Sequence, residues 1–112
     1  MNIRLTTTGR RSGEPREIPL YGWADGDDRI VVVGSRGGSA IDPAWAHNLR
    51  TDPHALLHIG HQTRKVVARE AEGDEHDRLW TLVCAEFPLY ARYQQRTKRR
   101  IPLFALEPDT VD

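Results

Sequence analysis

Short strand-like segments separated by turns rich in glycine, proline and aspartate are the feature that most constrains the fold of this chain. The segments at 9–15 and 25–28 have the composition of tight turns, and Pro19 marks an edge or a bulge in the strand between them. Tight turns between short neighbouring strands favour antiparallel pairing. By their alternating or continuous apolar patterns, strands are expected at residues 3–8, 16–24, 30–33, 55–59, 63–71 and 101–106.

Helical patterns interrupt this series of strands. A short helix is expected to begin with Asp42 as its N-cap and Pro43 at its first helical position. A longer helix follows Gly73, and Pro88 ends it; a shorter helix then carries residues 90–93. These elements predict a mainly β fold of the α+β class, in which a small antiparallel β-barrel carries about two or three flanking helices.

Length and charge limit the classes of protein that fit. The 112 residues suffice for a single domain, 1–112. The 16 basic residues balance the 16 acidic ones, which weighs against a nucleic acid as partner. No apolar run reaches the ~20 residues of a membrane span, and no signal sequence opens the chain, so a cytoplasmic location is expected. The single cysteine, Cys84, excludes an internal disulfide and is expected to be a small core residue.

Two arginine- and glycine-containing segments are candidates for binding an anion. The loop 35–38, Ser-Arg-Gly-Gly, follows a buried strand, and its glycines allow a ligand to approach the backbone amides closely. The turn 9–16 holds three arginines, which suit a phosphate or a chain of carboxylates. The alternatives are an ordinary glycine-rich loop and a solvated turn.

A flat aromatic ligand would need apolar walls, and residues 19–21, Trp45 and Asn48 are candidates for them. Tyr90 and Tyr93 share a helical face and are candidates for orienting or protonating a substrate. The alternative for each of these groups is packing in the core. The scattered histidines do not predict a metal site, and the basic residues between 92 and 100 are expected to form a solvated face.

The order of these motifs resembles the deazaflavin-dependent nitroreductase family. The resemblance runs from about Leu5 to Pro108, and Phe87 stands where relatives often carry a tyrosine. The motifs that carry it are Leu5-Thr6-Thr7-Thr8-Gly9-Arg10-Arg11-Ser12-Gly13, Pro19-Leu20-Tyr21, Ser35-Arg36-Gly37-Gly38, Pro43-Ala44-Trp45 with Asn48-Leu49, Phe87-Pro88-Leu89-Tyr90-Ala91-Arg92-Tyr93-Gln94, and Thr97 with Arg99-Arg100-Ile101-Pro102.

The resemblance implies a split β-barrel that binds coenzyme F420, an 8-hydroxy-5-deazaflavin with a phosphate-linked oligoglutamate tail. It implies that the phosphate and tail meet Arg11, Ser12 and Gly13. The ring would be lined by Ile18, Pro19, Leu20 and Tyr21, and the ring and its linker would be held by Val33, Gly34, Ser35, Arg36 and Gly37. The short helix would complete the site with Ala44, Trp45 and Asn48. Tyr90 would face the substrate with Tyr93 nearby, and these two tyrosines would be the catalytic residues.

The function implied is hydride transfer from the reduced cofactor to an electron-poor small molecule: a quinone, an enone or a nitro compound. Three alternatives remain: a deazaflavin carrier without turnover, a barrel that binds flavin mononucleotide (FMN), and a barrel that stacks single-stranded nucleic acid on Tyr21 and Trp23. A homodimer is compatible with a barrel this small, but no feature of the sequence requires one.

Overall fold

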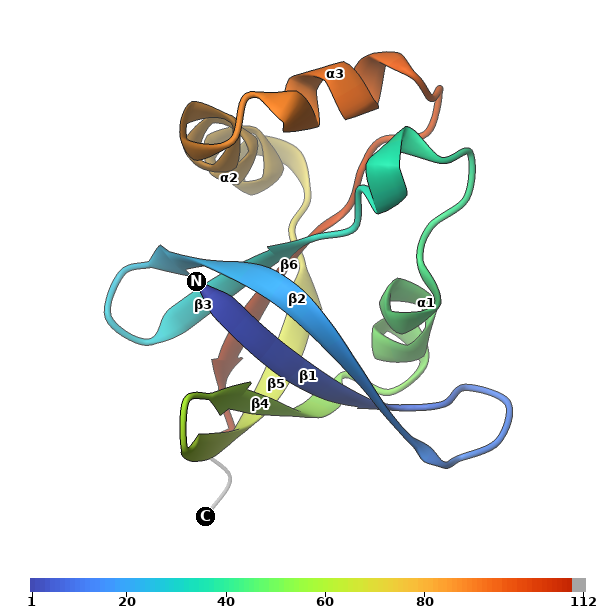
Figure 1. The fold of residues 1–112 in the computed structure, drawn as a ribbon, viewed down its shortest axis with the longest axis vertical. Coiled ribbons are helices and arrows are strands. Elements are labelled where there is room, and N and C mark those ends of the chain that lie inside the picture. The colour runs from blue at the N-terminus through green and yellow to red at the C-terminus, as the bar shows by residue number, and fades with distance from the viewer. Residues whose placement is uncertain (110–112) are drawn as a thin grey trace.

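Six strands, all paired antiparallel, close into one barrel in the computed structural model, which describes residues 1–109 (Figure 1). Around the barrel the strands follow the order β1-β2-β3-β6-β5-β4, and β4 pairs with β1 to close it. The predicted small antiparallel barrel is therefore confirmed. The strands are β1 (Asn2–Thr8), β2 (Pro15–Asp25), β3 (Arg29–Val33), β4 (His54–Ile59), β5 (Gln62–Glu70) and β6 (Leu103–Pro108).

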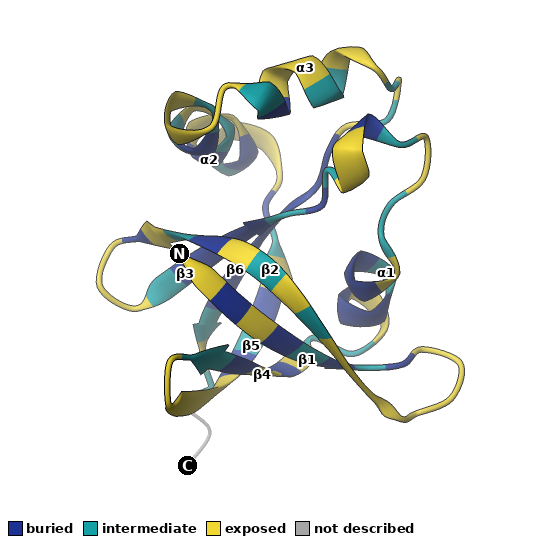
Figure 2. Cartoon of the chain, in the orientation of Figure 1, coloured by how far each residue is buried: buried dark blue, intermediate teal, exposed yellow. Residues whose placement is uncertain are grey.

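The predicted turns form the hairpins of the barrel. Gly26 between β2 and β3 and Gly60 between β4 and β5 have φ values of 76° and 57°, which glycine adopts without a steric penalty. The first strand shows the predicted alternation: Ile3, Leu5 and Thr7 are buried and their neighbours are more exposed (Figure 2). Local turn chemistry and strand periodicity thus agree with the topology.

Strand β2 extends beyond the segment that pairs with β3. It pairs with β1 from Pro15 to Tyr21, but with β3 only from Gly22 onward. The first part of β2 therefore has an unpaired edge, and Pro19 lies in this part. Because proline has no N–H to donate to a ladder, this position is the expected one for it.

In the part of the chain that the structure describes, three helices and one turn of 3-10 helix complete the fold. In Figure 1, α2 and α3 lie together beyond one end of the barrel, and α1 lies beside it. The short turn η1 packs against α3. The bounds are η1 (Arg36–Gly38), α1 (Ala44–Thr51), α2 (Gly73–Glu86) and α3 (Leu89–Gln95).

The apolar side chains form two clusters. One fills the barrel and includes Leu5, Leu57, Phe104 and Leu106, together with Trp45 from α1. The other lies between the barrel and the helices α2 and α3, and it contains Val31, Leu79, Val83, Tyr90 and Leu103. Cys84 packs against the second cluster, as predicted, and burial raises the pKa of its thiol. The cleft between the barrel and its helices is therefore bounded by two rigid layers.

Two predicted boundaries are wrong for identifiable reasons. Asp42 is not the N-cap of α1: the extended residue Pro43 (ψ 154°) occupies that position, and Asp42 instead pairs with two arginine side chains. The last strand begins at Leu103 rather than at residue 101. The amide of Ile101 donates to Gln94 and Pro102 has no N–H, so neither residue is available for the ladder.

Within residues 1–109, no helix combines the length and apolar character that crossing a membrane requires. In the same part of the chain, no group of three or more histidine, cysteine or acidic side chains is arranged to hold a metal ion.

Candidate functional site

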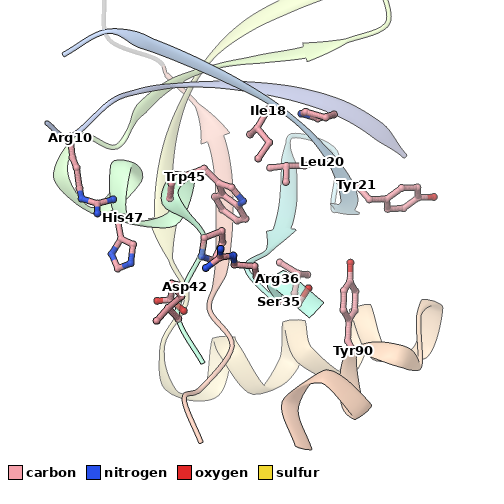
Figure 3. Close-up of a pocket in the computed structure, with 15 residues that line it drawn as sticks. Arg10, Ile18, Leu20, Tyr21, Ser35, Arg36, Asp42, Trp45, His47 and Tyr90 are labelled. Atoms are coloured by element: carbon pink, nitrogen blue, oxygen red, sulfur yellow. The ribbon is translucent and has the colours of Figure 1, made fainter. Parts of the chain in front are cut away.

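A cavity of about 800 Å³ lies between the unpaired part of β2, the loop after β3, the start of α1 and helix α3 (Figure 3). A second cavity of about 380 Å³ adjoins it beside the turn that joins β1 to β2. The two share Arg10, Ile18, Ala44 and Trp45 in their linings and form one continuous groove. The main cavity is lined by Arg10, Ile18, Pro19, Leu20, Tyr21, Val33, Ser35, Arg36, Ile41, Asp42, Pro43, Ala44, Trp45, His47 and Tyr90.

The walls of the main cavity are apolar and partly fixed by the core. Ile18 and Leu20 alternate with exposed neighbours on β2 and pack against the barrel cluster. Trp45 is 5% exposed, and its ring meets that of Phe104 edge-on with centroids 5.7 Å apart. Because packing holds the Trp45 ring, the slot between it and β2 is preformed for a flat ligand.

The groove is also cationic. Arg10 and Arg36 line the main cavity, Arg11 and Arg16 line the second, and no carboxylate within residues 1–109 forms an ion pair with any of the four. The carboxylates in the lining, by contrast, have partners elsewhere. Asp42 pairs with Arg50 and Arg99, and Glu17 with Arg4. The net field in the groove therefore favours an anion.

The loop after β3 is held in place chiefly by the guanidinium group of Arg99, and Arg96 adds a longer hydrogen bond to the Gly37 carbonyl at 3.4 Å. Arg99, 14% exposed, donates to the carbonyl oxygens of Gly34 (3.1 Å), Ser35 (2.8 Å) and Ser39 (2.7 Å). It also donates to Asp42 Oδ1 at 2.6 Å. The predicted solvated face is thus wrong for Arg99, whose fork of N–H donors matches four oxygens that converge on it.

These contacts support an unusual backbone conformation at the cavity. Arg36 has φ 46°, a left-handed value that is uncommon for a residue with a side chain. Such strain persists where the surrounding structure holds the backbone, and it concentrates at functional sites. The Arg99 contacts on either side of Arg36 provide that support and place its side chain in the cavity lining.

The turn between β1 and β2 is fastened by Asn48 of α1. Its side-chain amide donates to Thr7 Oγ1 at 3.0 Å, and its oxygen accepts from the backbone N–H of Arg10 at 3.1 Å. Ser12 Oγ accepts from the amide of Glu14 and from Arg16. Asn48 therefore lines the second cavity while positioning the arginine-bearing turn.

Tyr90 forms part of the far wall, toward α3. It is 8% exposed, and in Figure 3 its hydroxyl points from the helix toward β2. Burial raises the pKa of this hydroxyl, because a tyrosinate would be poorly solvated there. At neutral pH the group is accordingly a phenol, able to donate a hydrogen bond or a proton.

The structure brings most of the predicted site residues together. Ten line the main cavity: Ile18, Pro19, Leu20, Tyr21, Val33, Ser35, Arg36, Ala44, Trp45 and Tyr90. Three line only the second cavity: Arg11, Ser12 and Asn48. Four line neither: Gly13, Gly34, Gly37 and Tyr93. The amide of Gly34 already donates to the Pro102 carbonyl at 2.9 Å, and Tyr93 packs against Tyr90 in the second cluster.

Some lining residues were not predicted. Ile41, Asp42 and Pro43 directly follow the predicted loop, so their position in the sequence was a usable signal. No signal in the sequence marked His47 as a lining residue, because a histidine on a short helix has many roles. Arg99 was hidden among neighbouring basic residues, and its role depends on carbonyl groups distant in the sequence.

The barrel carries a groove whose apolar slot and arginines suit a flat, anionic ligand, and comparisons with known proteins identify its family. A family model described as F420H(2)-dependent quinone reductase matches residues 2–108. An F420H(2)-dependent quinone reductase of Mycobacterium tuberculosis H37Rv is 34% identical over 108 residues, covering 94% of this chain and 72% of the relative. A solved structure described as an F420-H2 dependent reductase (FDR-A) has a TM-score of 0.85 at 34% identity, covering 95% of this chain and 93% of that one. Another, described as a domain-swapped dimer, has the same TM-score and identity and covers 95% and 79%.

The chain belongs to the F420H(2)-dependent quinone reductase family. It is thus an oxidoreductase whose family uses coenzyme F420, and the expected resemblance is confirmed at the level of an F420-dependent reductase. The expected split barrel is confirmed as well.

Proposed function

We propose that the chain reduces quinones with the reduced form of coenzyme F420 bound along the groove. The observation that carries this proposal is the continuity of an apolar slot with a set of arginines that have no carboxylate partner among the described residues. The slot suits a planar ring, and the arginines suit a phosphate with a carboxylate tail. The named activities of the family and of the M. tuberculosis relative support the same conclusion.

The residues present fit this cofactor on physical grounds. Ile18, Leu20 and Trp45 supply apolar surfaces on facing sides of the main cavity. Arg36 and Arg10 lie at the cavity, and Arg11 lies along the second cavity that continues it. A guanidinium group without a protein partner keeps its donors for phosphate or carboxylate oxygens.

We assign the ring to the β2 side of the cavity and the tail to the turn. The ring would lie against residues 18–21, Val33, Ser35 and the Ala44–Trp45 pair of α1, with residues 34–37 near its linker. The tail would lie along Arg11, Ser12 and Gly13, in the turn that the hydrogen bonds of Asn48 hold in place. Gly13, Gly34 and Gly37 lie outside both linings and would contribute through the conformation of their loops, since the amide and the carbonyl of Gly34 already bond to Pro102 and Arg99.

Tyr90 is the residue that we assign to the chemistry of the acceptor. When bound, the reduced cofactor supplies a hydride, which is two electrons and one hydrogen nucleus. Reduction of a quinone to its hydroquinone then needs one further proton on a carbonyl oxygen. The Tyr90 Oη–H bond supplies it, and the tyrosinate recovers a proton from water. Tyr93, which contacts the Tyr90 ring, would help to orient it.

Binding and turnover with purified protein test the proposal. Oxidised coenzyme F420 titrated into the protein should bind with a measurable change in cofactor fluorescence. Oxidation of the reduced cofactor should then follow with a quinone, and the same assay with an enone and a nitro compound defines the range of acceptors. Binding without turnover of any acceptor would indicate a carrier, and preferential binding of FMN would refute the cofactor assignment.

The role of Tyr90 is tested by comparing Tyr90→Phe with Tyr93→Phe. The first variant should keep its affinity for the cofactor and lose most of its turnover. The second, at a ring that does not line the cavity, should lose less. Equal turnover in the wild-type protein and in Tyr90→Phe would remove Tyr90 from the chemistry.

We also propose a homodimer as the working form. The support is the solved relative described as a domain-swapped dimer, which covers 95% of this chain. Analytical ultracentrifugation at micromolar concentration should show twice the mass of the chain, and a monomer throughout would refute the proposal.

A further inference from the structure

The indole nitrogen of Trp23 is a buried donor without an acceptor. Within residues 1–109 no atom accepts a hydrogen bond from Trp23 Nε1, and it is the one such buried side-chain nitrogen or oxygen in that part of the chain. Trp23 lies on β2, two residues beyond Tyr21 of the cavity lining. An unsatisfied buried donor costs free energy, so its presence in an otherwise satisfied protein calls for a physical reason.

The polar group that this indole influences is the Tyr90 hydroxyl. The two rings meet edge-on at 79°, with centroids 6.3 Å apart. Burial raises the pKa of Tyr90, and so do its titratable neighbours Tyr21 on β2, Cys84 on α2 and Tyr93 on α3. The Trp23 indole acts in the opposite direction and lowers it. The edge contact between the two rings places a polar N–H group beside the phenol, although this N–H does not donate to the Tyr90 oxygen in the resting structure.

We propose that Trp23 is a positioning residue for the proton transfer from Tyr90: its indole N–H, which lacks an acceptor in the resting structure, donates to Tyr90 Oη as that oxygen gives up its proton toward the cavity. This inference rests on the function proposed above. An indole N–H is only a donor, so the phenol oxygen is the acceptor in any hydrogen bond between the two groups. Trp23 therefore cannot receive the proton of the phenol, and an acceptor bound in the cavity that Tyr90 lines can.

The same contact assists the chemical step. As the acceptor receives the hydride, the Tyr90 Oη–H bond breaks and its proton passes to the acceptor oxygen. Negative charge then develops on Oη. A hydrogen bond from Trp23 strengthens as that charge grows, which stabilises the transition state more than the ground state. The unsatisfied donor in the ground state is thus matched to a charge that appears only during reaction.

The test is a titration of Tyr90 in protein without cofactor. Tyrosine labelled with ¹³C at Cζ reports each hydroxyl by NMR, and Tyr90→Phe identifies the Tyr90 signal. Trp23→Phe keeps a ring but removes the N–H, and it should raise the Tyr90 midpoint by roughly one pH unit. Trp80→Phe is the matched control: its ring also packs on Tyr90, at 6.4 Å, but it should leave the midpoint unchanged.

An unchanged Tyr90 midpoint in Trp23→Phe overturns the inference, and so does an equal shift in Trp80→Phe. If Trp23→Phe does not fold, Tyr90→Phe supplies the reciprocal measurement. Above the Tyr90 midpoint, the indole N–H resonance of Trp23 should lie further downfield in the wild-type protein than in Tyr90→Phe, because a tyrosinate oxygen accepts from it, and equal positions overturn the inference.

Measurements of kcat in the same variants distinguish a failure of this inference from a failure of the proposed function. Trp23→Phe should lower kcat severalfold while leaving cofactor affinity unchanged, and Trp80→Phe should preserve kcat. Loss of turnover in Tyr90→Phe with no Tyr90 shift in Trp23→Phe would uphold the function and refute the role of Trp23. Full turnover in Tyr90→Phe would refute the proton transfer itself, whatever the titration shows.

Discussion

Replacing Arg99 with alanine removes the group that holds the loop after β3, and the structure sets the scale of the effect. Arg99 donates to three backbone carbonyls and to Asp42, and both charged side chains are about one-seventh exposed (14% and 15%). Breaking a fully buried ion pair costs about 3–5 kcal/mol. Here Arg50 still pairs with Asp42 at 2.7 Å, and the carbonyls can regain water as the loop opens. We therefore expect a loss of roughly 2–4 kcal/mol in the free energy of unfolding.

Two measurements check this prediction. Chemical denaturation gives the free energy of unfolding, and Tm should fall on the order of 10 °C for a domain of this size. The matched control is Arg100→Ala, since Arg100 and its partner Asp77 are 54% and 74% exposed. An exposed pair contributes at most about 1 kcal/mol, so this variant should stay close to the wild-type protein.

Cofactor binding gives the second readout for Arg99→Ala. Without Arg99 the loop loses the contacts that hold the left-handed backbone of Arg36, and affinity for coenzyme F420 should fall together with stability. A variant as stable as Arg100→Ala, with unchanged affinity, would refute the reasoning: the loop conformation would then be determined locally rather than by this guanidinium group.

Three more changes have defined outcomes. Arg36→Ala should weaken binding of coenzyme F420 about tenfold in a fluorescence titration, because one charge-assisted contact to the anion is lost. Arg78 hydrogen-bonds to Asp25 and holds the pKa of that carboxyl below its usual 3.8, so this pair contributes stability above that pH and loses it as the pH falls through the lowered pKa. Arg78→Ala should therefore be less stable than the wild-type protein in denaturation at pH 7, and the difference should shrink toward pH 3. Gly34→Ala places a methyl group 2.8 Å from a proline ring and should cost about 1–3 kcal/mol, visible as a lower Tm.

Local chemistry predicted most of the barrel. Strand alternation at Ile3, Leu5 and Thr7, the turn glycine at position 26 and the edge position of Pro19 each depend on a few neighbouring residues. Such signals can be read without knowing the tertiary structure. The resemblance to a known family added the identity of the cofactor, which no local pattern contains.

The errors arose where distant groups compete for one side chain. A local pattern makes Asp42 a helix cap, but the charges of Arg99 and Arg50 attract its carboxylate more strongly than a backbone amide does. Arg99 itself is indistinguishable in sequence from its solvated neighbours. The contact between Trp23 and Tyr90 joins a strand and a helix far apart along the chain, and only the fold shows that the indole has no acceptor.

The position of β6 in the barrel has a consequence for how the chain reaches its native state. This strand bridges β3 and β5, yet it follows both in the sequence. During synthesis the β1-β2-β3 meander and the β4-β5 hairpin emerge before residues 103–108, so the edges of β3 and β5 are unpaired until β6 arrives. Closure over such long separations is slow, on the order of milliseconds to seconds. An unpaired strand edge is a template for pairing with another chain, so we expect a higher protein concentration during folding to favour intermolecular pairing over closure of the barrel.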